Sequence, residues 1–162
     1  MRHVACLRAI AAALTCLAVL TACSGEPGRP TLEEATRQLA NDGDALLSMV
    51  KTDLTGLTEE RANKDRTTSC KPGEIQRYFT AKGNFTNLAG QDPISRIGLL
   101  KGKLQALGYR EVVDELDVSE DELGVVVTHH AEAHLTFVLV GRASEAPNLV
   151  IVGKTECYPR AG

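Results

Sequence analysis

Hydrophobic residues recur at helical spacing in two parts of the chain, and each part carries residues that favour helix ends. The first part opens with Thr31-Leu32-Glu33-Glu34, which has the form of a capping box with Thr31 as the N-cap. The second has Asp92 as an N-cap, proline in the first turn and Gly108 after the last turn. We therefore predict two amphipathic helices. Their apolar stripes are Leu32, Leu39, Leu46 and Val50 in the first helix and Ile94, Ile97, Leu100, Leu104 and Leu107 in the second.

Alternation of apolar and polar residues predicts β-strands in most of the remaining chain. The predicted strands are Tyr78–Phe85, interrupted by Gly83, then Tyr109–Val118, and finally Leu149–Tyr158. The polar stretch Thr58–Ser69 is mixed in charge, so we expect a loop or a short solvated helical piece there.

The longest alternating stretch begins at Leu123 and keeps a single two-residue phase as far as Leu139. An unbroken strand of that length would span roughly 55 Å, which is too long for a domain of this size. We therefore expect a turn or bulge within His129–His134, although no Gly, Pro, Asn or Asp marks it. A second turn is predicted at Arg142–Asn148, which contains Pro147.

These elements predict an α+β fold. Two helices would cover one face of an antiparallel sheet of about four to five strands, giving a two-layer sandwich. The 162 residues are 43% hydrophobic and 24% charged, which is ordinary for a globular protein and sufficient for one domain. We place that single domain at residues 31–162.

The N-terminal segment has the order of a bacterial lipoprotein signal. Arg2 and Arg8 are its only charges, and Ala9–Leu20 is an uncharged stretch of signal-core length. Leu20-Thr21-Ala22-Cys23 follows and resembles the lipobox of bacterial lipoproteins. The resemblance implies that residues 1–22 are removed and that Cys23 receives a diacylglyceryl thioether, with acyl groups such as palmitate. Residues 23–30 would then form a flexible tether, because Gly and Pro dominate them.

Two cysteines remain for the folded domain. Cys6 and Cys16 leave with the signal and Cys23 carries the lipid, so Cys70 and Cys157 form an even pair in an oxidising compartment. A disulfide between them would close a loop of about 88 residues, worth on the order of 4–5 kcal/mol in the chain-entropy model. The alternatives are a two-Cys metal site or free thiols, but neither cysteine has a partner ligand at metal-binding spacing.

The layout as a whole resembles small actinobacterial lipoproteins of the LppA-like kind. The resemblance rests on the lipobox, on Cys70 and on the segment from Asn148 to Cys157. It implies a lipid-anchored protein on the extracytoplasmic face of the cell membrane, and it implies the same disulfide. It supplies no catalytic residues.

Composition excludes several kinds of partner. Aromatic residues make up only 4% of the chain and tryptophan is absent, which argues against a sugar-binding or base-stacking platform. Without residues 1–22 the chain keeps 16 of its 18 basic residues and all 21 acidic ones, so its formal charge is −5 rather than −3. An acidic domain without a basic stripe is a poor candidate for nucleic-acid binding.

His130-Ala131-Glu132-Ala133-His134 is the one cluster of ligand-type residues in the sequence. On an extended strand, His130, Glu132 and His134 would lie in a row with about 7 Å between neighbours, too far apart to share one zinc ion. The pattern also differs from the helical HExxH motif. A solvated strand face or hairpin tip is therefore the preferred interpretation, and a metal site is the alternative.

These observations favour a non-enzymatic envelope lipoprotein without a cofactor. Its sheet face, or a crevice between helices and sheet, would bind a protein, a lipid or a small ligand. The competing hypothesis is a metal-binding protein or metal-assisted enzyme that uses His130, Glu132 and His134.

Overall fold

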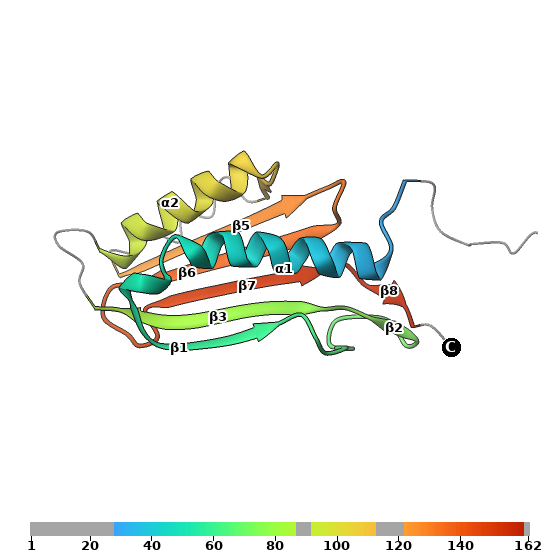
Figure 1. Ribbon diagram of the computed structural model, residues 1–162, viewed down its shortest axis with the longest axis horizontal. Helices are drawn as coiled ribbons and strands as arrows, with labels where there is room; N and C mark the ends of the chain where they lie inside the picture. Colours follow the sequence, from blue (N-terminus) through green and yellow to red (C-terminus); the bar gives the residue numbers. More distant parts are fainter. Residues whose placement is uncertain (1–27, 87–91, 113–121, 161–162) are drawn as a thin grey trace, which may run out of the picture.

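The computed structural model describes residues 28–86, 92–112 and 122–160, which form two helices on one face of a sheet (Figure 1). The main sheet has six strands in the order β1-β3-β7-β6-β5-β4, and β2 and β8 form a separate pair. All strand pairs are antiparallel. The elements are α1 (Leu32–Ser48), the short 3-10 helix η1 (Lys51–Asp53), β1 (Leu54–Arg61), β2 (Glu74–Ile75), β3 (Tyr78–Phe85), α2 (Pro93–Ala106), β4 (Arg110–Glu111), β5 (Leu123–His130), β6 (Leu135–Arg142), β7 (Leu149–Thr155) and β8 (Tyr158–Pro159).

The α+β class is confirmed, but the predicted count of four to five strands is too low. The largest omission is β1, which occupies part of the stretch expected to be a loop or a solvated helical piece. β1 is an edge strand with an irregular register between Thr55 and Thr58, and it has no fully buried residue. A strand that buries so little shows no clear apolar alternation, so its sequence looks like a polar loop.

Both helices begin at the predicted caps. The Thr31 hydroxyl accepts a hydrogen bond from the Glu34 backbone N–H, and the Glu34 carboxylate accepts one from the Thr31 N–H, which completes the capping box. Asp92 caps α2 in the same way through the backbone N–H of Ser95. α1 ends at Ser48, two residues before Val50, the last residue of the predicted apolar stripe.

The turn expected within His129–His134 is confirmed, and it reverses the alternation. β5 ends at His130 and β6 begins at Leu135, and these two residues pair directly. Directly paired residues of an antiparallel sheet point to the same face, so the face that carries Leu135 on β6 carries His130 on β5. The residues that share one two-residue phase in the sequence therefore lie on different faces of the sheet before and after the turn. Before the turn they lie on the face of His129, and after it they lie on the face of Leu135.

Close packing of α1 and α2 on the sheet creates the core. α1 contacts β7 and β3, whereas α2 contacts β6 and β5. Glycines allow the close approach: a Cβ on Gly153 would lie 2.5 Å from Phe137, and one on Gly141 would lie 2.8 Å from the carbonyl oxygen of Pro93. Side chains therefore fill the space between helices and sheet.

The last predicted strand is divided in two. β7 stops at Thr155, and Cys157 lies in the connection to β8, so Cys157 does not continue the core-facing phase of Leu149 and Ile151. Of the predicted strand Tyr109–Val118, only β4 is seen, and residues 113–118 lie outside the described residues. Within the described ranges, neither α1 nor α2 is long and apolar enough to cross a membrane.

Candidate functional site

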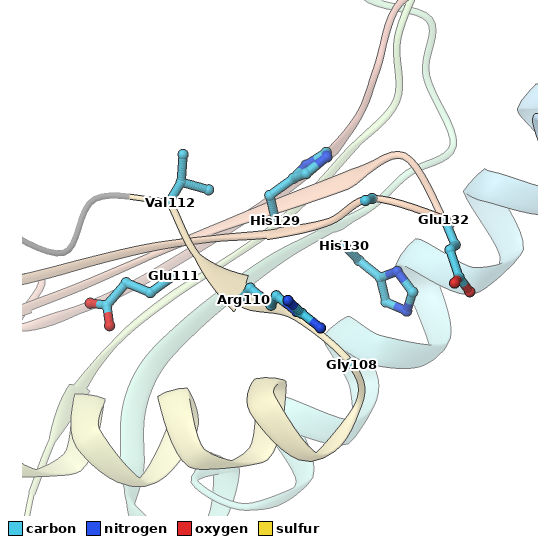
Figure 2. A pocket seen from close by; sticks show the side chains of 8 residues that line it. Gly108, Arg110, Glu111, Val112, His129, His130 and Glu132 are labelled. Carbon is cyan, nitrogen blue, oxygen red and sulfur yellow. The ribbon is translucent and has the colours of Figure 1, made fainter.

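A pocket of about 550 Å³ lies at the end of the sheet where β4 meets the β5–β6 turn (Figure 2). Arg110 and Glu111 come from β4, His129 and His130 from the end of β5, and Glu132 from the turn. Because neighbouring residues of a strand point to opposite faces, the pocket wraps the sheet edge. Figure 2 shows His129 and Val112 on one side of β5 and His130 on the other.

His130 is held by contacts rather than left free in this pocket. Its ring packs edge-on against Tyr109 with ring centroids 5.1 Å apart, and its Nδ1 accepts a hydrogen bond of 3.3 Å from the backbone N–H of Ala133. Its Nε2 lies over Gly108, where an added Cβ would approach to 2.9 Å. Gly108 also has φ +94°, so two independent constraints require glycine at this position.

Below His130 lies a buried carboxylate that sequence reasoning missed. Asp42 of α1 is 3% exposed and accepts hydrogen bonds from the Tyr109 hydroxyl (2.7 Å) and the Gln38 side-chain amide (3.0 and 3.1 Å). Burial, and secondly the hydrogen bond to Asp42, raise the pKa of Tyr109 well above its ordinary value, so the phenol stays a neutral donor. This network ties α1 to the segment between α2 and β4.

The structure does not bring the three metal-ligand candidates together. His130 faces Tyr109, whereas the Nδ1 of His134 lies 2.7 Å from a carboxylate oxygen of Glu156. Glu132 lies on the turn between them and borders the pocket. Across residues 28–86, 92–112 and 122–160, no three His, Cys, Asp or Glu side chains converge as a metal site would require.

Contacts between the N-terminal segment and the C-terminal part of the domain gather near Glu156, beside the β5–β6 turn. Arg29, in the predicted tether, donates a 2.9 Å hydrogen bond to the carbonyl oxygen of Cys157, and its guanidinium lies 4.5 Å from the centre of the Tyr158 ring. It also forms a 3.3 Å ion pair with Glu156. The tether is therefore bound to the domain at Arg29, two residues before the first helix is capped.

The predicted cysteine pair is present. Cys70 and Cys157 form a disulfide, with Cα atoms 5.7 Å apart. The bond joins the loop before β2 to the connection before β8, and β2 and β8 also pair with each other. The disulfide, the Arg29 contacts and the start of α1 thus lie at one end of the domain. Cys23 itself lies outside the described residues.

The sheet face that the helices leave open carries a compact set of valines. We call this set the valine patch: two rows of directly paired residues, one on each of β5, β6 and β7. All are partly buried, as is usual for neighbours on a sheet, and no described helix covers them (Figure 1). The rows are Val125, Val140 and Val150, and Val127, Val138 and Val152.

Comparison with protein-family models, curated proteins and solved structures finds no match for this chain. The functional argument therefore rests on the residues and surfaces described above.

Proposed function

We propose that the protein is a lipoprotein of the bacterial cell envelope, anchored through lipid on Cys23 at the extracytoplasmic face of the membrane. Its folded domain is a non-enzymatic binding module that recognises a protein partner through the open face of the sheet. The observation that carries the binding role is the valine patch, since apolar residues gathered on an uncovered face are typical of interaction sites.

The contacts of Arg29 support the anchored arrangement. Arg29 lies six positions after Cys23, and an extended chain covers at most about 3.5 Å per residue. The disulfide end of the domain would then stay within about 20 Å of the lipidated residue. A tether this short would keep the domain close to the membrane surface.

The packing of the core supports the sheet face over the other predicted binding surface. A lipid carrier needs an apolar cavity between helices and sheet. Here the contacts around Gly43, Gly141 and Gly153 are too close even for one added carbon atom. The open face, by contrast, offers apolar area without any rearrangement of the domain.

Substitution of the lipidated residue tests the anchor. Cys23→Ala should abolish incorporation of a fatty-acid analogue and block signal cleavage, because no other residue at the cleavage point can form the thioether. Cys16→Ala is the matched control, since Cys16 lies within the apolar core of the signal. Undiminished label in Cys23→Ala would refute the anchor.

A photoreactive side chain at position 138 tests the binding face. In intact membranes, position 138 should crosslink to protein, whereas position 99, an exposed leucine on α2, should not. Equal crosslinking at both positions would refute the assignment of the open face.

A further inference from the structure

We infer that the disulfide end of the domain binds the anionic headgroups of phospholipids in the membrane that holds the lipid on Cys23. The binding surface is a set of four cations around the disulfide, which we call the basic cluster: Lys64, Lys71, Lys154 and Arg160. The inference goes beyond the proposed function and rests on it for the anchor. It leaves the valine patch to the protein partner.

The disulfide and the short sheet beside it hold two members of the basic cluster together. Lys71 follows Cys70 directly, and Cys70 is bonded to Cys157. The backbone N–H of Arg160 donates a 2.8 Å hydrogen bond to the carbonyl oxygen of Gly73, next to the antiparallel pair β2–β8. Figure 1 shows β2 and β8 at the same end of the domain as the start of α1.

The other two members come from the main sheet and from the loop after β1. Lys154, near the end of β7, lines a pocket together with Cys157. Lys64 lies two residues before Arg66, whose backbone pairs with that of Gln76 just after β2. The four cations are scattered along the sequence, so no basic stripe in the sequence marks them.

The cations of the basic cluster have no counter-ions within the domain. Across residues 28–86, 92–112 and 122–160, none of the four forms an ion pair. Lys64, Lys71 and Arg160 are exposed, and Lys154 is half-buried. Their charges are therefore available to an external anion.

The acids of the same region are already engaged. Asp65 lies 2.6 Å from the guanidinium of Arg77. Glu74 accepts a 3.2 Å hydrogen bond from a backbone N–H, and Glu156 forms its 3.3 Å ion pair with Arg29. The region around the disulfide thus carries positive charge that its own carboxylates do not neutralise.

Neighbouring residues do not cancel this excess. Arg110 of β4 offsets the charge of Glu132 on the β5–β6 turn. In the first turns of α1, Glu34 is bound in the capping box, and Arg37 offsets the charge of Glu33. The positive charge of the basic cluster therefore remains.

The opposite end of the sheet has no such excess. Arg96 there pairs with Asp53, and Arg142 lies 4.0 Å from Glu145. Acids outnumber cations among the charged residues described at that end, which are Lys51, Arg96, Arg142, Asp53, Asp92, Glu122 and Glu145. The two ends of the domain therefore differ in charge, and an anionic surface would attract the disulfide end.

The tether favours lipid headgroups over an acidic protein as the occupant. Arg29 binds the carbonyl oxygen of Cys157, three residues after Lys154. At most about 20 Å of chain then separates Arg29 from Cys23, the residue that would carry the lipid. Charged headgroups act over a Debye length of about 8–10 Å, so the basic cluster is kept within their reach. A basic patch beside a lipidated residue is a common second signal for membrane binding.

Quenching by labelled headgroups tests the contact in the full-length lipoprotein. A fluorescent label is placed at Asn63→Cys, beside the basic cluster, or at Thr52→Cys, at the opposite end, and both positions are exposed. The vesicles contain phosphatidylcholine with a nitroxide on its headgroup, with or without phosphatidylglycerol. Phosphatidylglycerol should raise quenching at position 63 by about threefold or more, and it should leave quenching at position 52 unchanged.

Neutral substitutions identify the residues responsible. Each cation near an anionic surface strengthens binding by about fivefold, so Lys71→Gln with Arg160→Gln should lower the ratio of contacting to free domain by about 25-fold. Lys51→Gln with Lys82→Gln is the matched control, since it removes the same charge away from the disulfide, and it should leave this ratio unchanged. Salt at about 1 M, where the Debye length is about 3 Å, should also abolish the contact.

Each alternative result overturns the inference. Equal quenching at position 63 with and without phosphatidylglycerol, in chain that stays on the vesicles, would exclude the contact and leave the anchor intact. Equal losses in the two double variants would show that net charge, and not the basic cluster, is responsible. Chain that carries no fatty-acid label and stays on neither kind of vesicle would refute the anchor and the inference together, so the failures are distinguishable.

Discussion

The two faces of the sheet are built on different principles, although the same strands supply both. On the helix-covered face, β6 contributes Leu135, Phe137 and Leu139, all fully buried. Large side chains there meet glycines such as Gly43 and Gly153, so the surface is shaped to two particular helices. The centre of the open face repeats one small side chain, valine, and the next row holds His129, Thr136 and Lys154. The helix-covered face is thus shaped to elements of the same chain, whereas α1 and α2 do not contact the open face.

Shortening the side chains of two adjacent residues of β6 should show the largest difference in stability between the two faces of the sheet. Phe137 is fully buried against Phe79 and Tyr109, so Phe137→Ala should lower the free energy of unfolding by about 3–5 kcal/mol. Val138 lies on the open face, and Val138→Ala should cost less than about 1 kcal/mol. Urea unfolding of both variants measures the difference. Similar losses would show that the open face is buried within the monomer.

The sequence predicts the elements and buried residues of the helix-covered face better than those of the open face. Capping residues and apolar spacing predict α1 and α2 because those signals are local, and the buried positions Leu39, Leu46 and Leu104 are among the predicted stripes. The alternation of β5 was misleading. Its valines occupy both phases, and the turn after His130 reverses the face without any residue typical of turns.

Removal of the disulfide should have the second largest effect on the free energy of unfolding. It should destabilise the whole domain rather than one face of the sheet. Replacing Cys70 and Cys157 with serine should lower the free energy of unfolding by about 2–4 kcal/mol, chiefly because the unfolded chain gains freedom. The ranking of Phe137→Ala above Val138→Ala should persist in this background. Urea unfolding of the oxidised, reduced and serine forms provides the measurement. Two free thiols in denatured, unreduced protein would contradict the bond.

The buried hydrogen bond between Asp42 and Tyr109 could not be predicted from the sequence, for a physical reason. Asp42 and Tyr109 are 67 positions apart, and each is an ordinary residue in its local pattern. Only the packing of α1 beside the α2–β4 connection joins them. The metal alternative met the same difficulty, because the spacing of His130 and His134 could not show that the turn gives the two side chains different partners.

Removal of one buried hydroxyl should have a smaller, pH-dependent effect. Tyr109→Phe deprives Asp42 of a hydrogen bond and should cost about 1–2 kcal/mol at pH 7. The folded state raises the pKa of Tyr109, so above about pH 10 the unfolded chain releases the proton that the folded protein keeps. Wild-type protein then loses stability that the variant does not.

The gap between wild type and Tyr109→Phe should therefore narrow as pH rises past about 10. Urea midpoints at pH 7 and at about pH 10.5 check this. Tyr78→Phe is the matched control from the open side of β3, where removal of the hydroxyl should change stability at pH 7 by less than about 0.5 kcal/mol. A constant gap for Tyr109→Phe would contradict the role of its buried phenol.

The smallest expected difference in stability is between substitutions of the two histidines at the β5–β6 turn, one packed on a buried ring and one at the surface. His130 packs on Tyr109 and accepts a hydrogen bond from Ala133, so His130→Ala should cost about 1 kcal/mol. His134 pairs with a partly exposed Glu156, and His134→Ala should change stability by no more than about 0.5 kcal/mol. Because both rings are engaged by different partners, neither variant should alter a metal affinity. Calorimetric titration of metal-free protein should show no tight zinc binding, and one equivalent bound with sub-micromolar affinity, lost in the double variant, would instead establish the metal hypothesis.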